Sequence, residues 1–319
     1  MANGELTYLQ VLRWSEEECR DFLEAERWPN GVACPRCGVV DPYRIERKRP
    51  GKNTVTKLFK CQGCKKQFSV TIGTIFEGSH IPLNKWFAAI FMMCAGKKGT
   101  SAHQIHRTLD ITYKSAWFLL HRIRLAMKEP GSPFLSGTIE ADETYVGGRY
   151  RISPRGRAKG VARGRPKGGS HKTAVFGMIE RGGRVYTQVV PNVKGTTLTP
   201  ILLEHMDTER SHLITDEMGA YAHIKDHLPH SVITHASEYV RGDIHTNVIE
   251  NYWSTLKRGL YGTYQHVDRA YLGCYLDEFA FRFNRRKVTD AQRFRMAVRQ
   301  TDAHGRLRWF FQTANESPA

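Results

Sequence analysis

Two pairs of cysteines limit what the first part of this chain can fold into. Cys34 and Cys37 form one Cys-x-x-Cys step, and Cys61 and Cys64 form a second, with 23 residues between the two steps. Each step lets two thiolates point at one ion, and four thiolates complete the closed tetrahedron of a structural Zn²⁺. Buried free thiols or a redox pair are the alternatives, but two such steps together favour zinc. We therefore predict a zinc ribbon over residues 31–78 with these four cysteines as ligands.

The chain is strongly basic, with 48 Lys and Arg against 31 Asp and Glu and a formal net charge of +17. An excess of this size favours a polyanionic partner, above all nucleic acid, although a basic protein without such a partner is the alternative. Between the two cysteine pairs stand seven basic residues that would bring the ribbon against the DNA backbone: Arg44, Arg47, Lys48, Arg49, Lys52, Lys57 and Lys60.

A second basic segment, residues 149–172, holds nine basic residues, several glycines and no acid. It cannot pack a core, so we predict a loop. The loop is either a solvated linker or an arm that orders on phosphates, because like charges repel one another until a polyanion neutralises them. The candidates for DNA contact in this loop are Arg155, Arg157, Arg163 and Arg165.

The N-terminus and the other cysteines bear on the compartment. No apolar run is long enough to cross a bilayer, and the chain does not begin with the basic-then-apolar pattern of a secretory signal. We therefore expect a cytoplasmic protein associated with the nucleoid. In that reducing compartment the seven cysteines, an odd number, are not expected to form disulfides. Cys19, Cys94 and Cys274 have apolar neighbours in the sequence and are predicted core residues.

Helical patterns surround the ribbon. Residues 1–30 contain an amphipathic helical segment at 7–28, and residues 79–130 contain a helix at 83–95 and two further helices separated at Asp110 and Ile111. Thr112 is a predicted N-cap. The last two helices fit a helix-turn-helix, although such pairs also occur in proteins that bind no DNA. The candidates for its DNA-facing side are Tyr113, Lys114, Trp117 and Arg124.

Residues 135–290 mix strands and helices and predict an α/β domain that contains the basic loop 149–172. Its expected strands are Thr138–Val146, Thr173–Glu180, Arg184–Pro191 and His212–Thr215, which are rich in β-branched residues. Helices are expected at 197–208, 217–228 and 247–260. The remaining residues, 291–319, are assigned to a C-terminal helix and a polar tail.

Three acids stand out by their positions in this domain. Asp142 lies within the first strand, Asp216 ends an apolar strand, and Glu250 lies on a later helix. Alone, a strand-end Asp is usually a turn residue and a helical Glu is usually solvated. As a set, two aspartates and one glutamate offer the oxygen ligands that two Mg²⁺ or Mn²⁺ ions need for an in-line displacement at phosphorus. We therefore predict catalysis by Asp142, Asp216 and Glu250.

Neighbouring groups compete for these roles. Glu140 lies on the same side of the strand as Asp142, because side chains alternate along a strand. Lys257 follows Glu250 by two helical turns, so both share a face and the cation can reach a phosphate beside the metals. The rivals as metal ligands are Glu140, Glu143, Glu217, His245 and Asn247.

The segments Asp142-Glu-Thr-Tyr-Val-Gly-Gly148, Thr215-Asp216 and Asn247-Val-Ile-Glu250, with Trp253, Ser254 and Lys257-Arg-Gly259, closely resemble the transposases of insertion sequence (IS) family 1595. The cysteine ribbon, the helix pair and residues 275–286 are also similar to that family, so the resemblance covers about residues 10 to 300.

The resemblance implies an RNase H-like catalytic domain, recognition of terminal inverted repeats, and Mg²⁺-dependent strand cleavage and transfer into target DNA. Synapsis of two element ends implies a homodimer or a larger assembly. Some members carry Asn as the third ligand, and this chain has both Asn247 and Glu250, so that choice stays open. The alternatives are a DNA-binding regulator with an inactive nuclease-like domain and a nuclease that cuts without joining; the intact set of acids argues against the regulator.

Overall fold

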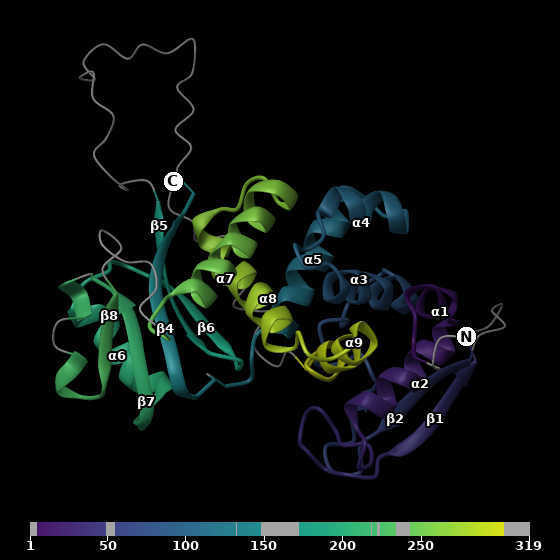
Figure 1. Ribbon diagram of the computed structural model, residues 1–319. Helices are drawn as coiled ribbons and strands as arrows, with labels where there is room; N and C mark the ends of the chain where they lie inside the picture. Colours follow the sequence, from purple (N-terminus) through teal and green to yellow (C-terminus); the bar gives the residue numbers. More distant parts are fainter. Residues whose placement is uncertain are drawn as a thin grey trace, which may run out of the picture. The chain divides into compact units, whose positions relative to one another are not determined.

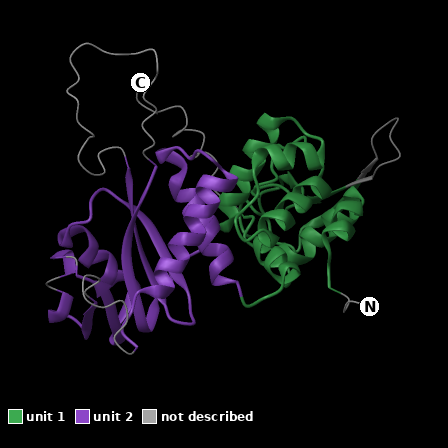
Figure 2. Cartoon of the chain, turned by 45° about the horizontal axis from the view of Figure 1, so that its top comes forward, with its two compact units in different colours: residues 1–128, 287–319 green, residues 129–286 purple. Residues whose placement is uncertain are grey.

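The computed structural model describes residues 5–48, 55–131, 133–147, 172–217, 219–221, 224–233 and 243–302. The chain divides into two compact units, residues 1–128 with 287–319, and residues 129–286 (Figure 2). The predicted loop, including Arg155, Arg157, Arg163 and Arg165, lies outside the described residues except for Lys172, as does the tail from residue 303. Within the described ranges, no helix is both long and apolar enough to span a membrane.

The N-terminal segment forms two helices where one was predicted. α1 (Tyr8–Arg13) ends before Ser15, which caps α2 (Glu16–Arg27). The Ser15 hydroxyl accepts the Glu18 N–H at 3.2 Å, and Glu18 in turn accepts the Ser15 N–H at 2.7 Å. This reciprocal cap starts a new helix at Ser15 and explains the break that the amphipathic pattern missed.

Aromatic rings form the helical core of the first unit. α3 (Leu83–Ala95) packs against α9 (Asp290–Arg299), the C-terminal helix. Phe87 and Phe294 meet edge to face with ring centroids 5.9 Å apart, and Phe22 of α2 stacks on Phe294 at 5.7 Å. Residues far apart in the sequence thus share one core, and α9 belongs to this unit instead of forming a separate C-terminal part.

Two more helices and a small sheet complete the first unit. α4 (Ala102–Leu109) and α5 (Tyr113–Met127) are separated at Asp110, whose φ of 47° ends α4. Thr112 caps α5, as predicted, by accepting the Ser115 N–H at 3.2 Å. The ribbon contains the antiparallel strands β1 (Tyr43–Lys48), β2 (Val55–Lys60) and β3 (Gln67–Phe68), in that order.

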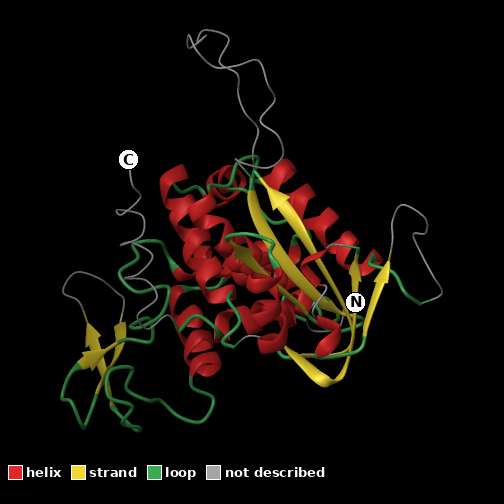
Figure 3. Ribbon diagram, turned by 90° about the vertical axis from the view of Figure 1, so that its left-hand side faces the viewer, coloured by secondary structure: helices red, strands yellow, loops and turns green. Residues whose placement is uncertain are grey.

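The second unit is built on a five-stranded mixed sheet of order β6-β5-β4-β7-β8 (Figures 1 and 3). β4 (Leu135–Val146), β5 (Thr173–Glu180) and β6 (Val185–Val190) are antiparallel neighbours. β7 (Met206–Asp216) runs parallel to β4, and β8 (His230–Ile233) runs parallel to β7.

Each face of this sheet carries its own apolar cluster. Ile139 and Ala141 pack with α6 (Gly195–His205) on one face. On the other face lie α7 (Asn247–Arg258) and α8 (Leu272–Asn284), joined by a π-helical turn at Gly259–Thr263 and a 3-10 turn at Arg269–Tyr271. The alternation along β4 therefore puts Glu140 and Asp142 on the α7 face.

The prediction of a helix at 217–228 is wrong. The described residues of this segment form two single 3-10 turns, Gly219–Tyr221 and Ile224–Asp226. Tyr221, Ile224 and Leu228 pack into the cluster beneath α6, which gives the segment an apolar pattern without a continuous helix.

Candidate active site

Asp142 lies where β4 faces α7, and both of its carboxylate oxygens are held. Oδ1 accepts the backbone N–H of Glu143 at 2.7 Å, and Oδ2 accepts the indole N–H of Trp253 at 3.0 Å. Burial, with a smaller contribution from the charges of Asp216 and Glu250, raises the pKa of Asp142 to about 6. The three predicted acids therefore lie close enough together to interact electrostatically.

The sheet register explains how Asp216 reaches Asp142. β7 pairs in parallel with β4, and Ile214 is the partner of Glu140. This is the last paired position, and two residues further along each strand lie Asp142 and Asp216, the last residue of β7. Because the two strands are parallel, their acids lie toward the same end of the sheet.

Glu250 comes from α7 and lines a hollow of about 590 Å³ together with Asp142. Its Oε1 accepts the Thr246 hydroxyl at 2.8 Å. One face of α7 and the turn after it supplies most of the wall, at positions 250, 253, 254, 257, 258 and 261. The lining residues are Asp142, Glu143, Thr144, Glu250, Trp253, Ser254, Lys257, Arg258 and Tyr261. Acids and cations therefore border the same space.

Glu140, the rival on the same strand face, is fully buried and has other partners. Its carboxylate pairs with Arg181 at 2.7 Å and accepts the backbone N–H groups of Val248 at 2.8 Å and Ile249 at 3.0 Å. These donors belong to the first turn of α7, where the helix dipole favours a negative charge. Glu140 thus anchors the helix that carries Glu250 and does not line the hollow.

The remaining rivals divide between the hollow and its surroundings. Glu143 lines the hollow and accepts the hydroxyl of Tyr221. Burial is the main cause of the rise in the pKa of Glu143 to about 7. His245 lies 3.3 Å from Glu140, within the network that anchors α7. Asn247 and Glu217 are exposed and are not among the lining residues.

The donor chemistry at the hollow suits hard divalent cations. Asp142 and Glu250 line the hollow with carboxylate side chains, and Asp216 lies close enough to influence the pKa of Asp142. Carboxylate oxygens are the ligands that Mg²⁺ and Mn²⁺ prefer, and an ion there would relieve the mutual repulsion of the acids. The types of ligand atom at the hollow therefore suit a divalent metal ion.

The four ribbon cysteines form a tight cluster. All four Sγ atoms lie within 4.8 Å of one another, with Cys34 and Cys64 at 3.8 Å and Cys37 and Cys61 at 3.4 Å. Four sulfurs bound to zinc at about 2.3 Å would be about 3.8 Å apart. A hydrogen bond from the Val39 backbone is the main cause that lowers the pKa of Cys37 to about 6, which favours the thiolate that zinc binds.

The chain matches two family profiles. Residues 134–284 match an ISXO2-like transposase domain, and residues 14–67 match a transposase zinc-ribbon domain. It is 32% identical over 278 residues, 84% of its length and 90% of the relative's, to a protein in transposable element ISH50 of Halobacterium salinarum.

The chain belongs to the transposases of insertion sequence (IS) family 1595. A transposase-like protein of Haemophilus influenzae is 31% identical over 113 residues, which is 33% of this transposase and 85% of that protein. The second unit is the α/β domain predicted from the sequence, with a mixed sheet flanked by helices, and the zinc ribbon is also as predicted. The crystal structure of the Mos1 strand transfer complex aligns at 13% identity over 73% of this chain and 78% of that chain, with a TM-score of 0.29.

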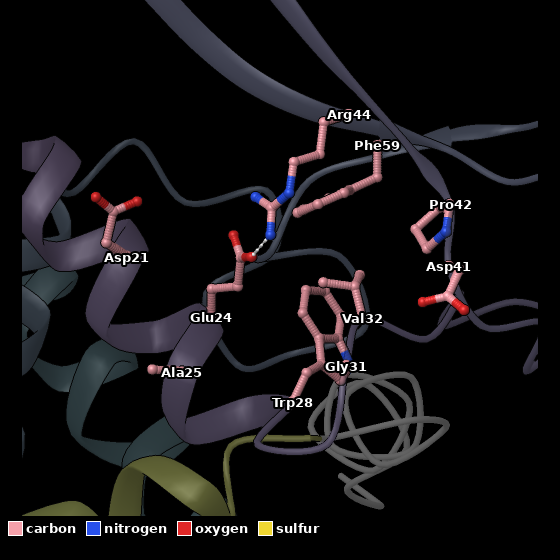
Figure 4. Close-up of a pocket in the computed structure, with 10 residues that line it drawn as sticks. All are labelled: Asp21, Glu24, Ala25, Trp28, Gly31, Val32, Asp41, Pro42, Arg44 and Phe59. Carbon is pink, nitrogen blue, oxygen red and sulfur yellow. Dashed lines mark hydrogen bonds and ion pairs between the residues drawn. The ribbon is translucent and has the colours of Figure 1, made fainter.

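The ribbon of this transposase carries part of its positive charge in ion pairs with α2. Figure 4 shows Glu24 of α2 facing Arg44 of β1 beside the ring of Phe59. Lys57 of β2 pairs with Glu17 at 2.9 Å and with Asp21 at 3.0 Å. Asp21, Glu24 and Arg44 line a hollow of about 580 Å³. Two of the basic residues predicted to meet DNA are therefore already paired with acids of the same unit.

The predicted DNA-facing residues of α5 differ in exposure. Tyr113, which is 46% exposed and lies against His103 with ring centroids 4.4 Å apart, and Lys114 are at the surface of the first turn. Arg124 is only 1% exposed, so its prediction as a DNA contact is wrong. It follows the buried residues Ala116 and Leu120 at four-residue steps and thus continues their buried face.

Several residues of the hollow were absent from the sequence prediction. Arg258, Tyr261 and Thr144 line the hollow together with Lys257, the predicted phosphate contact. Tyr261 is 49% exposed, so an aromatic ring at the border of the hollow is accessible to solvent. The spacing of 250, 254, 257, 258 and 261 along one helical face could have indicated Arg258 and Tyr261.

Proposed function

We propose that this transposase cuts and rejoins DNA at the terminal inverted repeats of its insertion sequence, using two divalent metal ions held by Asp142, Asp216 and Glu250. The observation that carries the proposal is the hollow that Asp142 and Glu250 line together with Lys257 and Arg258. The interaction of Asp216 with Asp142 supports a third carboxylate at the same place.

Each group has a distinct part in this proposal. Mg²⁺, or Mn²⁺ in its place, would activate the attacking oxygen and stabilise the leaving oxygen in the in-line displacement. The carboxylates are oriented before substrate arrives, because Asp142 is held at both oxygens and Glu250 accepts the Thr246 hydroxyl. Lys257, half-buried two turns after Glu250, binds a DNA phosphate beside the acids. Water first releases a 3′ hydroxyl at the element end, and that hydroxyl then attacks target DNA.

DNA recognition is assigned to the first unit. Tyr113 and Lys114, at the exposed start of α5, would contact the element end as part of a helix-turn-helix, and the zinc ribbon would contact backbone phosphates. Arg155, Arg157, Arg163 and Arg165 would order on DNA phosphates. Pairing of two ends requires a homodimer or a larger assembly, and a DNA substrate of this kind places the protein in the cytoplasm at the nucleoid.

The test uses purified protein, a labelled duplex of the element end and a plasmid target in Mg²⁺. We expect joined product from the wild type and from Asn247→Ala, but not from Asp142→Ala, Asp216→Ala or Glu250→Ala, all of which should still bind the duplex. Glu217→Ala is the matched control, because Glu217 is an exposed acid next to Asp216. A wild type that binds but never cuts with Mg²⁺ or Mn²⁺ would contradict catalysis and favour a DNA-binding regulator.

A further inference from the structure

Trp253 is a core residue of α7 whose side chain also bonds to Asp142. Its side chain is only 4% exposed, yet its one polar atom, Nε1, donates to Oδ2 of Asp142 at 3.0 Å. Trp253 follows Glu250 by three residues, so both lie on one face of the helix and both line the hollow. One helix therefore carries a proposed metal ligand and the donor that holds another.

The indole bond completes the restraint on the Asp142 carboxylate. The other oxygen, Oδ1, accepts the N–H of Glu143 at 2.7 Å. A carboxylate oxygen has two lone-pair sites, so each oxygen keeps one acceptor direction for a further ligand. With both oxygens bonded, the carboxylate cannot rotate without breaking a hydrogen bond.

The sheet beneath Trp253 is shaped to admit its ring. Gly177 of β5 is the register partner of Asp142. A Cβ atom at Gly177 would lie 2.5 Å from Cη2 and 2.6 Å from Cζ2 of Trp253, a distance that real Cβ atoms essentially never show. Any side chain at position 177 would therefore displace the indole. The Cγ2 atom of Thr187, the partner of Gly177 on β6, lies 3.3 Å from the same Cβ position.

We propose that Trp253 is a positioning residue that fixes the Asp142 carboxylate for metal binding, and that Gly177 is glycine so that the indole can reach it. This inference rests on the proposed function, because it assumes that Asp142 binds the metal. Hydrogen-bond partners behind a metal ligand orient it and typically alter metal affinity about 10–100-fold when they are removed. If the ring only fills the core, its N–H is dispensable for metal binding.

The test measures Mn²⁺ affinity by isothermal titration calorimetry on the full chain with its zinc retained, with near-UV circular dichroism to check folding. Trp253→Phe removes the N–H and keeps an aromatic ring, and Gly177→Ala leaves Trp253 and Asp142 intact but obstructs the indole. We expect each to weaken Mn²⁺ binding at the hollow about 10-fold or more. Tyr252→Phe, which removes a buried hydroxyl from the adjacent position of α7, should change the affinity less than about 2-fold.

The double variant separates positioning from general damage. In Trp253→Phe the shorter ring no longer extends over position 177, so adding Gly177→Ala should cost little further affinity. Additive losses would overturn the role given to Gly177, and an unchanged affinity in Trp253→Phe would overturn the role of Trp253 even if Gly177→Ala fails to fold. Asp142→Ala tests the underlying assumption. If Asp142→Ala binds Mn²⁺ as the wild type does, the proposed metal site itself is wrong, whereas loss in Asp142→Ala alone rejects only the positioning role.

Discussion

Glu140 accepts the backbone N–H of Val248 at 2.8 Å, which bonds the strand that carries Asp142 to the helix that carries Glu250. The two residues are 108 positions apart in the sequence. Glu140 precedes Asp142 by two residues, and Val248 precedes Glu250 by two. The hydrogen bond between Glu140 and Val248 is therefore two residues from Asp142 along β4 and two residues from Glu250 along α7.

Exchange of Glu140 for Gln tests this anchor. Gln keeps an acceptor for the N–H groups of α7 but loses the charge that pairs with Arg181 at 2.7 Å. Because the half-buried guanidinium of Arg181 then loses the charge of its counterpart, we expect the free energy of unfolding to fall by about 1–3 kcal/mol. Strand cleavage should fall more than DNA binding. Urea unfolding and a cleavage assay measure these effects, with Glu209→Gln, an exposed acid of β7, as control. Equal behaviour of the two variants would show that Glu140 anchors nothing of consequence.

The burial of Asp142 makes the metal-free site a source of instability. Burial raises the pKa of Asp142 from 3.8 to about 6. A carboxyl that binds its proton more tightly when folded stabilises the fold below its unfolded pKa, and this contribution is lost as pH rises through the folded value. Between about pH 4 and 6 the metal-free protein should therefore lose stability through this group.

Asp142→Asn should accordingly stabilise the metal-free protein at pH 7.5, by on the order of 1–3 kcal/mol, while it abolishes cleavage. The measurement is thermal unfolding at pH 5 and pH 7.5 of desalted protein that retains its zinc. The gain should shrink at pH 5, where the wild-type carboxyl is largely protonated. Added Mn²⁺ should raise the melting temperature of the wild type but not of the variant. A variant less stable than the wild type at both pH values would refute the electrostatic cause.

Local patterns in the sequence were enough to predict much of the fold. The apolar run at β5, which lies between the charged residues Lys172 and Arg181, gives its bounds, Thr173–Glu180, and the cap at Thr112 fixes the start of α5. The four cysteines of the zinc site could be predicted from their spacing alone, because each Cys-x-x-Cys step brings two thiolates to the same ion. β8 (His230–Ile233) escaped prediction because it has four residues and leaves Val232 43% exposed, so it lacks an alternating pattern.

The different roles of Glu140 and Asp142 could not be predicted from local sequence patterns. Strand alternation places both acids on one face of β4, and their chemical types are alike. Only the fold brings Val248, Ile249 and Arg181 to Glu140 and leaves Asp142 at the hollow. The burial of Arg124 has a similar origin, because a charged residue at the end of a helix is usually solvated unless tertiary packing covers it.

Loss of a zinc ligand should unfold the ribbon. The buried cluster of the ribbon is small, namely Cys34, Phe59, Cys61 and Phe68, and two of its members are metal ligands. A core of this size rarely folds without a bound metal ion or a disulfide bond. We expect the Cys61→Ser variant to lose zinc. It should also lose the near-UV circular dichroism signal of Trp28, whose ring packs on Phe59 with centroids 5.7 Å apart. Zinc content and near-UV circular dichroism measure this, and Cys274→Ser, a half-buried cysteine of the second unit, should keep one zinc per chain. Full zinc content in Cys61→Ser would contradict the ligand assignment.

The salt dependence of DNA binding tests the role of α5. Lys114 lies exposed in the first turn of α5, whereas Lys128 is exposed just beyond its last turn. A lysine that neutralises one phosphate releases bound counterions, so its removal lowers the slope of log affinity against log salt concentration by about 1. We expect this change for Lys114→Ala on a duplex of the element end, with the slope unaltered in Lys128→Ala. Tyr113→Ala should weaken binding without changing the slope, because it removes contact area and no charge. If Lys128→Ala lowers the slope and Lys114→Ala does not, the opposite end of α5 faces the DNA.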